Sequence, residues 1–213
     1  MAALGQIEWP PILQRRLIWF QELGLGYYPV DPADEPYDQA YFDKYVGYAN
    51  TDMGRAITAA RVDFVGKFWR GDVVDVGIGC GAFVEARPQQ TYGYDVNPAG
   101  LAWLHARDCY WNPYTDPCDA VTMWDVMEHI ADFPALLQNV SRHCFICLPI
   151  FYGADDVLSS KHFRRDEHRW YFTFDGLKRC MEQLGWTLVG FDQFETMLGR
   201  EQITSFAFRR DYQ

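Results

Sequence analysis

The sequence predicts an α/β fold with a mostly parallel sheet and helices on both of its faces. From Gly71 onward, β-branched apolar segments alternate with segments of helical apolar spacing, and this alternation is typical of parallel sheets. The first strand of the series runs directly into a glycine-rich turn, as in nucleotide-binding folds. The chain has 213 residues, of which 49% are hydrophobic, which is enough for one domain with a sizeable core.

Three helices are expected before that strand. Ile12 to Leu23 has helix-like apolar spacing, which the glycines and the proline that follow it stop. Val30 to Pro36 is rich in proline and acidic residues and is expected to be a loop. Two further helices are expected over about Tyr37 to Val46 and about Gly54 to Trp69.

The elements expected after residue 70 alternate in type, at spacings that fit an α/β sheet. They are strands at Gly71–Gly77, Thr91–Val96, Ala120–Trp124 and Cys144–Pro149, helices beginning at Ala82 and covering Pro98–Ala106, Phe133–Val140 and Thr173–Leu184, and final strands at Trp186–Phe194 and Gln202–Phe208.

The charge balance argues against extended nucleic-acid binding. The chain holds 19 basic and 29 acidic side chains, a formal net charge of −10, whereas a protein that follows a phosphate backbone needs a basic stripe. A small-molecule partner is therefore the expectation, and the oligomeric state is left open.

No signal peptide and no membrane span are expected. Met1 to Trp9 lacks a basic stretch followed by an apolar one, and the most apolar run, Cys144 to Tyr152, is far shorter than the roughly 20 residues that cross a bilayer. Cys144 and Cys147 would face opposite sides of a strand, so they cannot share a metal ion. We therefore expect a cytoplasmic protein with reduced cysteines.

The most informative segment runs from Val73 to Gly81. Gly77, Gly79 and Gly81 permit positive φ angles and let a ligand approach the main chain closely. The helix expected directly behind the turn would present its positive N-terminal end to a negative group of the ligand. Asp75, two residues before the first glycine, suits a cationic ammonium group better than a pyrophosphate.

Asp95 lies at the end of the second expected strand, 18 residues after Gly77. A carboxylate at this position can accept hydrogen bonds from both hydroxyls of a ribose. The alternative is a structural aspartate that caps the helix expected from Pro98. Together with the glycine-rich turn, Asp95 favours a nucleoside cofactor.

These motifs resemble those of the class I S-adenosylmethionine-dependent methyltransferases. The resemblance rests on Asp75 to Gly81, on Asp95 and on Ala120 to Ile130, and it covers residues 70–150 well. It implies S-adenosylmethionine as the cofactor. It also implies a Rossmann-like sheet of seven strands whose last strand is antiparallel.

The resemblance further implies roles for single residues. Asp75 and Gly77 would hold the methionine moiety, and Asp95 would bind the ribose. Val96 would pack on the adenine, and Trp124 would contact the methionine end of the cofactor.

Asp108 and Cys109 are a looser match to the family. The family often places a carboxylate near this position for the adenine amino group, but Tyr110 to Cys118 does not copy the family's usual run. We include both residues in the predicted cofactor site. A plain loop aspartate is the alternative for Asp108.

Asp125, Glu128 and His129 follow the strand Ala120–Trp124, at the edge where open α/β sheets bind ligands. They are similar to a cluster that binds a divalent cation in some quinone-pathway O-methyltransferases, and such side chains are suitable ligands. The same residues also occur as a helix start with a structural histidine, so we expect no metal site. His129 is a candidate general base.

A locally basic, aromatic segment, Ser159 to Phe172, interrupts the pattern of strands and helices. In the family this position commonly holds an insertion that recognises the substrate. His162, Arg164 and Arg165 are predicted to bind an anionic group of the acceptor, and His168 to orient or deprotonate its nucleophile. A solvated loop anchored by its aromatic residues is the alternative.

Tyrosines also recur along the second expected helix, and Tyr41 is predicted to contact the acceptor. This aromatic stripe either packs against the core or forms a lid. One domain over residues 1–213 is expected, with a helical cap or lid at 1–70, a cofactor-binding core at 71–150, an insertion at 151–172 and a final helix and strands at 173–213.

The predicted activity is methyl transfer to a small-molecule or glycan-like acceptor, with oxygen favoured as the target atom. Alternatives are transfer to nucleic acid or protein and a non-catalytic protein of the same fold. An NAD-dependent oxidoreductase is a further alternative, because Gly77, Gly79 and Ala82 also satisfy a dinucleotide-binding pattern.

Overall fold

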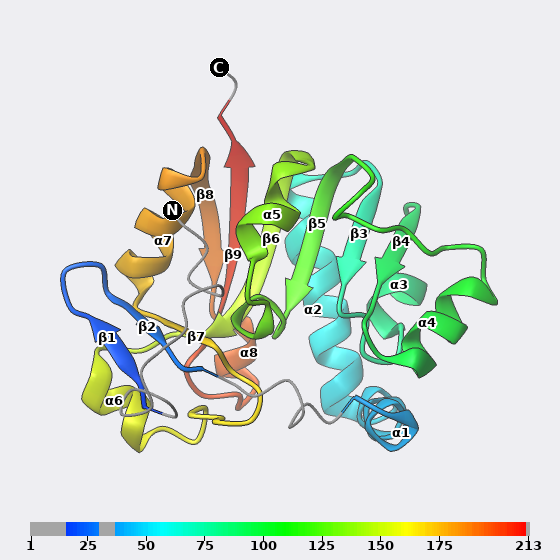
Figure 1. Ribbon diagram of the computed structural model, residues 1–213. Helices are drawn as coiled ribbons and strands as arrows, with labels where there is room; N and C mark the ends of the chain where they lie inside the picture. The colour runs from blue at the N-terminus through cyan, green and yellow to red at the C-terminus, as the bar shows by residue number, and fades with distance from the viewer. Residues whose placement is uncertain (1–15, 30–36, 212–213) are drawn as a thin grey trace.

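The computed structural model describes residues 16–29 and 37–211. Six strands form its main sheet, in the order β4-β3-β5-β6-β9-β8 (Figure 1). The first four are parallel, and β9 runs antiparallel to both of its neighbours, which confirms the predicted α/β class and the antiparallel last strand. The strands are β3 (Val73–Val76), β4 (Thr91–Tyr94), β5 (Cys118–Trp124), β6 (Val140–Pro149), β8 (Trp186–Asp192) and β9 (Ile203–Arg210).

The main sheet has six strands within the described ranges, and the expected number of seven is wrong. Beyond β4 the chain makes only an isolated parallel bridge between Gly93 and Tyr110. The N–H of Gly93 donates to the carbonyl of Cys109 at 2.8 Å, and the N–H of Trp111 donates to the carbonyl of Gly93 at 2.9 Å. Pro113 follows closely, and because a proline has no N–H to donate, strand pairing does not continue.

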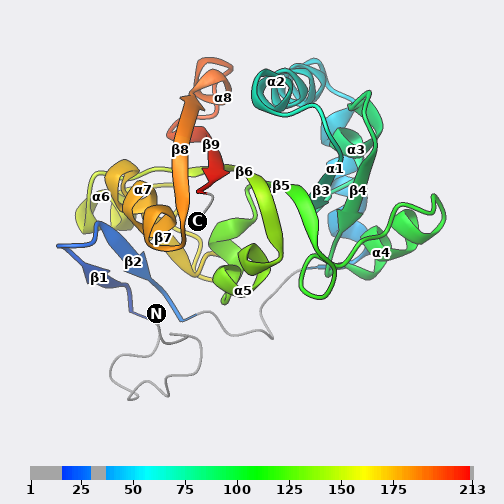
Figure 2. The ribbon, with the colours of Figure 1, turned by 90° about the horizontal axis from the view of Figure 1, so that it is seen from above.

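Helices cover both faces of the sheet, as predicted (Figure 2). Because alternate strand residues face opposite sides, β6 contributes to two buried clusters. Cys144 lies in a cluster with Leu177 of α7 (Phe174–Gln183), and Cys147 lies in another with Phe64 of α2 (Asp52–Phe68). The two cysteines therefore do face opposite sides of the sheet.

The helices begin close to the predicted positions, and several have side-chain caps. The Thr51 hydroxyl accepts from the N–H of Gly54 at the start of α2, and Thr173 caps α7 in the same way. None of the described helices is both long and apolar enough to cross a membrane. The helices are α1 (Gln39–Ala49), α2 (Asp52–Phe68), α3 (Ala82–Ala86), α4 (Pro98–His105), the 3-10 turn η4 (Met127–His129), α5 (Phe133–Gln138), α6 (Ala154–Ser159), α7 (Phe174–Gln183) and α8 (Phe194–Met197).

A second, three-stranded sheet joins distant parts of the chain. β1 (Ile18–Phe20) pairs with β2 (Leu25–Tyr27), and β2 pairs with β7 (Trp170–Phe172), all antiparallel. The helix expected over Ile12–Leu23 is therefore wrong from residue 16 onward. Its β-branched and aromatic residues favour a strand once a partner is present, and local spacing does not reveal that partner. Residues 12–15 of this expected helix and the loop expected at Val30–Pro36 lie outside the described residues.

Candidate functional site

A cavity of about 900 Å³ opens at the edge of the sheet toward which β3, β4 and β5 point, and α1 lies at the same edge (Figure 1). Ligands of open α/β sheets bind at this edge, and the volume lies within the range of about 300–1,000 Å³ typical of small-molecule sites. The predicted site residues that line the cavity are Tyr41, Asp75, Gly77, Gly79, Asp95, Val96, Trp124, His129, His162, Arg164 and His168.

The glycine-rich turn forms one wall of the cavity. Gly77 has a φ of 71°, and a Cβ atom added there would lie 2.5 Å from Cγ2 of Val126, so only glycine fits. Gly79 presents bare main chain below Tyr45 of α1, whose nearest atom lies 3.9 Å from where a Cβ would be. Gly81 is not part of the cavity lining. It precedes α3 and leaves room for the ring of Trp103.

Asp75 lies buried on β3 beside the turn. Its Oδ1 accepts a hydrogen bond from the hydroxyl of Thr122 on β5 at 2.6 Å. Burial raises the pKa of Asp75 to about 7, although the hydrogen bond from Thr122 and the charge of Arg61 act in the opposite direction. A cationic group bound in the cavity would favour the charged form of this carboxyl.

Asp95 follows β4 and is buried at the cavity wall. Its Oδ1 accepts a hydrogen bond from the N–H of Asn97 at 2.8 Å. Burial raises the pKa of Asp95, and hydrogen bonds from backbone groups, including those of Ile78 and Gly79, partly offset this. The neighbouring Val96 is 59% exposed, so an apolar side chain stands open to the cavity next to a carboxylate.

Asp108 and Cys109 do not line the cavity, so the structure does not place them with the other predicted cofactor-binding residues. Asp108 is exposed in a turn with a φ of 53°. Cys109 is buried in a small cluster with Leu104, and its thiol donates to the Leu104 carbonyl at 3.7 Å. These two residues lie away from the cavity because the chain beyond them makes only an isolated bridge to Gly93, within the described residues, and Cys109 packs against α4.

Trp124 lies at the end of β5 and is held between two neighbours. Its ring packs against Phe83 with a centroid distance of 5.3 Å, and the guanidinium of Arg61 lies 5.1 Å from its centroid. Its indole N–H is buried and has no hydrogen-bond partner among the described residues. A donor is thus left available at the predicted methionine end of the cofactor site.

Arg61 also belongs to an ion-pair network that no pattern in the sequence predicts. This side chain of α2 binds Glu195 of α8 at 2.7 Å and Asp125 at 3.0 Å. Arg200 also binds both carboxylates, with Asp125 at 2.9 Å. Burial would raise the pKa of Asp125, but Arg200 and Arg61 outweigh it and hold the pKa at about 2. Asp125 is therefore a structural anion whose carboxylate oxygens are both taken by arginine.

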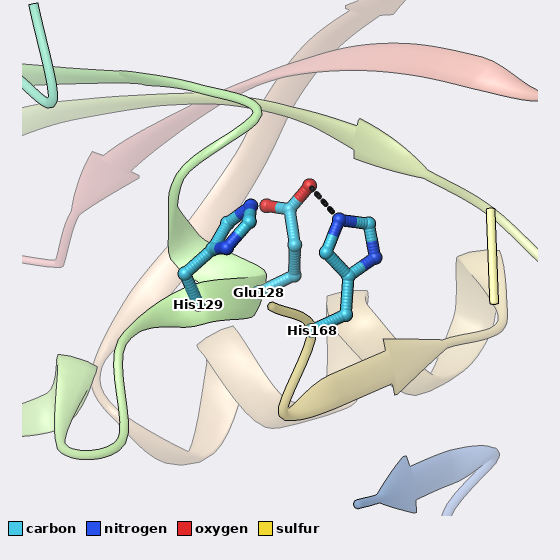
Figure 3. A group of neighbouring side chains, drawn as sticks. All are labelled: Glu128, His129 and His168. Carbon is cyan, nitrogen blue, oxygen red and sulfur yellow. Dashed lines mark ion pairs between the residues drawn. The ribbon is translucent and has the colours of Figure 1, made fainter. Parts of the chain in front are cut away.

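Glu128, His129 and His168 come together on the other side of the cavity (Figure 3). The rings of His129 and His168 meet edge to face with centroids 4.6 Å apart. Nε2 of His168 lies 4.0 Å from Oε1 of Glu128. Burial lowers the pKa of both histidines and raises the pKa of Glu128 well above its usual value, so both imidazoles are neutral at pH 7.

One backbone and one side-chain hydrogen bond hold the insertion against η4 and the residue that follows it. The N–H of Arg169 donates to the Glu128 carbonyl at 2.8 Å, and the indole N–H of Trp170 donates to the Ile130 carbonyl at 2.9 Å. These bonds fix His168, which lies immediately before Arg169. His129 and His168 are predicted from separate local patterns in the sequence, and their spacing does not indicate that they meet.

The remaining insertion residues divide into two groups. His162 and Arg164 line the cavity, and Arg164 pairs with Glu167 at 3.1 Å. Arg165 does not line it, because its guanidinium lies over the ring of Phe163, 5.3 Å from the centroid. The structure therefore separates Arg165 from the rest of the predicted acceptor site.

Tyrosines of the N-terminal region line the cavity. Tyr37, Tyr41, Tyr45 and Tyr48 all line it, whereas Phe42 is the buried residue of α1. The rings of Tyr41 and Tyr45 are 5.0 Å apart and their hydroxyls are hydrogen-bonded at 3.3 Å. Tyr37 reaches Nδ1 of His129 with its hydroxyl at 3.3 Å, so this region touches both sides of the site.

Comparison with known proteins decides the family. The sequence model of a family described as a methyltransferase domain matches residues 45–190. The chain belongs to this methyltransferase family. The recognition of a class I S-adenosylmethionine-dependent methyltransferase from the sequence motifs is thereby confirmed. A search of curated proteins found no match.

Solved structures share the fold of this methyltransferase at low sequence identity. Magnesium protoporphyrin IX methyltransferase from Synechocystis PCC 6803, with S-adenosylhomocysteine bound, aligns with a TM-score of 0.56 and 12% identity over 82% of this chain and 96% of that one. An S-adenosylmethionine-dependent methyltransferase from Archaeoglobus fulgidus has a TM-score of 0.56 and 15% identity, over 80% and 99%. The glycopeptide N-methyltransferase MtfA aligns with a TM-score of 0.52 and 11% sequence identity, over 73% of this chain and 87% of that one.

Proposed function

We propose that this methyltransferase transfers a methyl group from S-adenosylmethionine to an oxygen atom of a small-molecule or glycan-like acceptor. One observation carries the proposal. The same cavity is lined on one side by the glycine-rich turn with Asp75 and Asp95, and on the other by two neutral imidazoles, His129 and His168.

The first side is suited to the cofactor. Asp75 would bind the ammonium group and Asp95 the ribose hydroxyls, while the exposed Val96 offers an apolar surface to the adenine. Gly77 and Gly79 let the cofactor lie against bare main chain. S-adenosylmethionine supplies a methyl group that is already activated by a sulfonium centre.

The second side is suited to the acceptor. A hydroxyl nucleophile must lose its proton, and a neutral imidazole of His129 or His168 can accept it. Arg164 and His162 would bind an anionic or hydroxyl-rich part of the acceptor. The α1 tyrosines, Tyr41 among them, would cover both molecules and exclude water, so that alignment and desolvation account for much of the rate.

Titration calorimetry with S-adenosylhomocysteine and with NAD tests the cofactor assignment. We expect binding of S-adenosylhomocysteine and none of NAD, and Asp95→Ala should weaken that binding by at least about tenfold through the loss of the ribose contacts. Asp119→Ala is the matched control, because Asp119 is an exposed aspartate at the far end of β5. Binding of NAD alone would contradict the proposal.

The acceptor class is tested with labelled S-adenosylmethionine and pools of hydroxyl and amine compounds. Transfer to hydroxyl acceptors is expected, and transfer confined to amines would contradict oxygen as the target atom. We further propose a cytoplasmic setting. The six cysteines are all free, which fits a reducing compartment.

A further inference from the structure

Glu128 and His168 carry buried polar atoms that the proposed function leaves without partners. Glu128 is 1% exposed, and neither of its carboxyl oxygens has a hydrogen-bond partner in the part of the chain that the structure describes. The same is true of Nδ1 of His168, a side chain that is 5% exposed. A buried polar atom without a partner is destabilising, because it has lost its hydrogen bonds to water, so each one calls for an explanation such as an ion.

The arrangement of these atoms indicates what the partner is. One possible ligand atom from each of Glu128, His129 and His168 lies within 4.8 Å of the other two. The Glu128 carboxyl points between the two imidazoles (Figure 3). One carboxylate with two imidazoles is a ligand set for Zn²⁺ and related first-row cations. With bonds of about 2.1 Å, tetrahedral geometry puts ligand atoms about 3.4 Å apart, so small side-chain rotations would close this site.

We propose that Glu128, His129 and His168 together bind one divalent first-row transition-metal ion of the Zn²⁺ type. This set differs from the one considered in the sequence. Asp125 is excluded because Arg61 and Arg200 occupy its oxygens, and His168 of the insertion takes its place. The proposal also departs from the expectation that no metal is bound.

The surrounding charges permit such an ion. Two arginines of the cavity act against a bound cation, and both are already paired: Arg164 with Glu167 at 3.1 Å, and Arg200 with Asp125 at 2.9 Å and with Glu195. A charged carboxylate in a buried position is favourable only when a cation lies beside it, and the bound ion would supply that positive charge to Glu128.

The site also has a place for the acceptor. Three protein ligands leave at least one coordination position free, and all three residues line the cavity. An acceptor hydroxyl bound there would have its pKa lowered by the ion. This last step deepens the proposed function and rests on it. In the metal-loaded protein His129 and His168 are ligands and do not act as bases. The ion makes the hydroxyl acidic enough to release its proton to solvent water, and the resulting alkoxide would take the methyl group as its bond to the sulfonium sulfur breaks.

Cobalt titration of the full chain tests the proposal without reference to activity. Chelator-treated protein is titrated with Co²⁺ and followed by visible absorption, and Zn²⁺ is then added as a competitor. We expect one equivalent of Co²⁺ with the bands of nitrogen and oxygen ligands. Glu128→Gln and His168→Asn should lower the affinity by at least about 100-fold, more than the loss of an outer-shell partner. His162→Ala, which removes another histidine of the same cavity, should leave it unchanged.

A stability measurement complements the titration. Zn²⁺ should raise the Tm of the wild-type protein and not that of His168→Asn. No saturable binding by wild type, unchanged affinity in both variants, or thiolate-to-cobalt absorption bands would each overturn the proposal. Binding of S-adenosylhomocysteine by each variant shows that it is folded. If wild-type protein did not bind S-adenosylhomocysteine, the proposed function would be contradicted, but the cobalt titration would still test the metal site. Failure of the proposed function and failure of the metal proposal are therefore distinguishable.

Discussion

The hydroxyl of Thr122 donates a 2.6 Å hydrogen bond to the buried carboxyl of Asp75, linking neighbouring strands directly below the glycine-rich turn. This bond stabilises the charged form of Asp75, yet burial is the larger effect and raises the pKa to about 7. The carboxyl proposed to bind a cationic group is thus partly protonated near neutral pH.

Cofactor affinity should therefore depend on pH through Asp75. Below pH 7 the carboxyl is protonated, and its proton must leave before an ammonium group binds well. We expect the affinity for S-adenosylhomocysteine to rise roughly tenfold between pH 5.5 and pH 8 and then to level off. Calorimetry across this range measures it. Asp75→Asn should bind more weakly with a flat profile, whereas Asp119→Asn should keep the wild-type slope, and a flat wild-type profile would refute the assignment.

Gly77→Ala should disrupt the cofactor side of the cavity. The added Cβ would lie 2.5 Å from Val126, and the φ of 71° is unfavourable for alanine. We expect a loss of about 1–3 kcal/mol in the free energy of unfolding and at least a tenfold loss in affinity for S-adenosylhomocysteine. Gly47→Ala is the control. Gly47 is an exposed residue of α1, and no atom lies within 4 Å of the added Cβ. The Gly47→Ala substitution should therefore raise the free energy of unfolding by up to about 1 kcal/mol.

The ion-pair network should be a large contributor to stability. Glu195→Gln leaves Arg61 and Arg200 without one of their two carboxylate partners, and breaking a buried pair costs about 3–5 kcal/mol. Urea unfolding at pH 7 measures the change. Glu182→Gln removes a solvent-exposed pair with Lys178 and should cost less than about 1 kcal/mol. Equal effects of the two substitutions would show that the buried network contributes no more to stability than an exposed ion pair does.

Asn97 should control how firmly α1 is held over the cavity. Its side-chain oxygen caps α4 by accepting from the N–H of Ala99, and its amide group donates to the carbonyl of Asp38 at the start of α1, each at 2.9 Å. Asn97→Asp keeps the cap and loses the donor. We expect faster amide hydrogen exchange over Gln39–Ala49 with little change in global stability.

Asn97→Ala removes both interactions of this side chain and serves as the comparison. It should show the same faster exchange of α1 and, in addition, a free energy of unfolding lower by about 1 kcal/mol, because the cap of α4 is lost. Unchanged exchange in both variants would mean that other contacts, such as those of the α1 tyrosines, hold the helix in place.

The cofactor side of the site was predictable because its residues are close in the sequence. Asp75, Gly77 and Gly79 belong to one strand and turn, and Asp95 directly follows the next strand, so parallel pairing brings them to the same edge. The same reasoning failed for Asp108, because its position depends on whether the chain forms another strand beyond β4, and it forms only a bridge.

The acceptor side was only partly predictable, since its contacts join distant elements. His129 and His168 were each chosen from local patterns, but their meeting depends on the hydrogen bond between Arg169 and Glu128. Arg61 and Glu195 had no local signal at all. A surface arginine on a predicted helix looks the same in sequence as one whose partner lies 134 residues away.

The three-stranded sheet has a practical consequence for work with this protein. The family match covers residues 45–190, whereas β1 and β2 precede this range and β9 follows it. A shortened chain cut at those limits would lose β9, which joins β6 to β8, and would leave β7 without its strand partner β2 next to His168. Exposed strand edges of this kind promote aggregation. A shortened protein intended for expression must therefore extend beyond residues 45–190, the region that the family match covers.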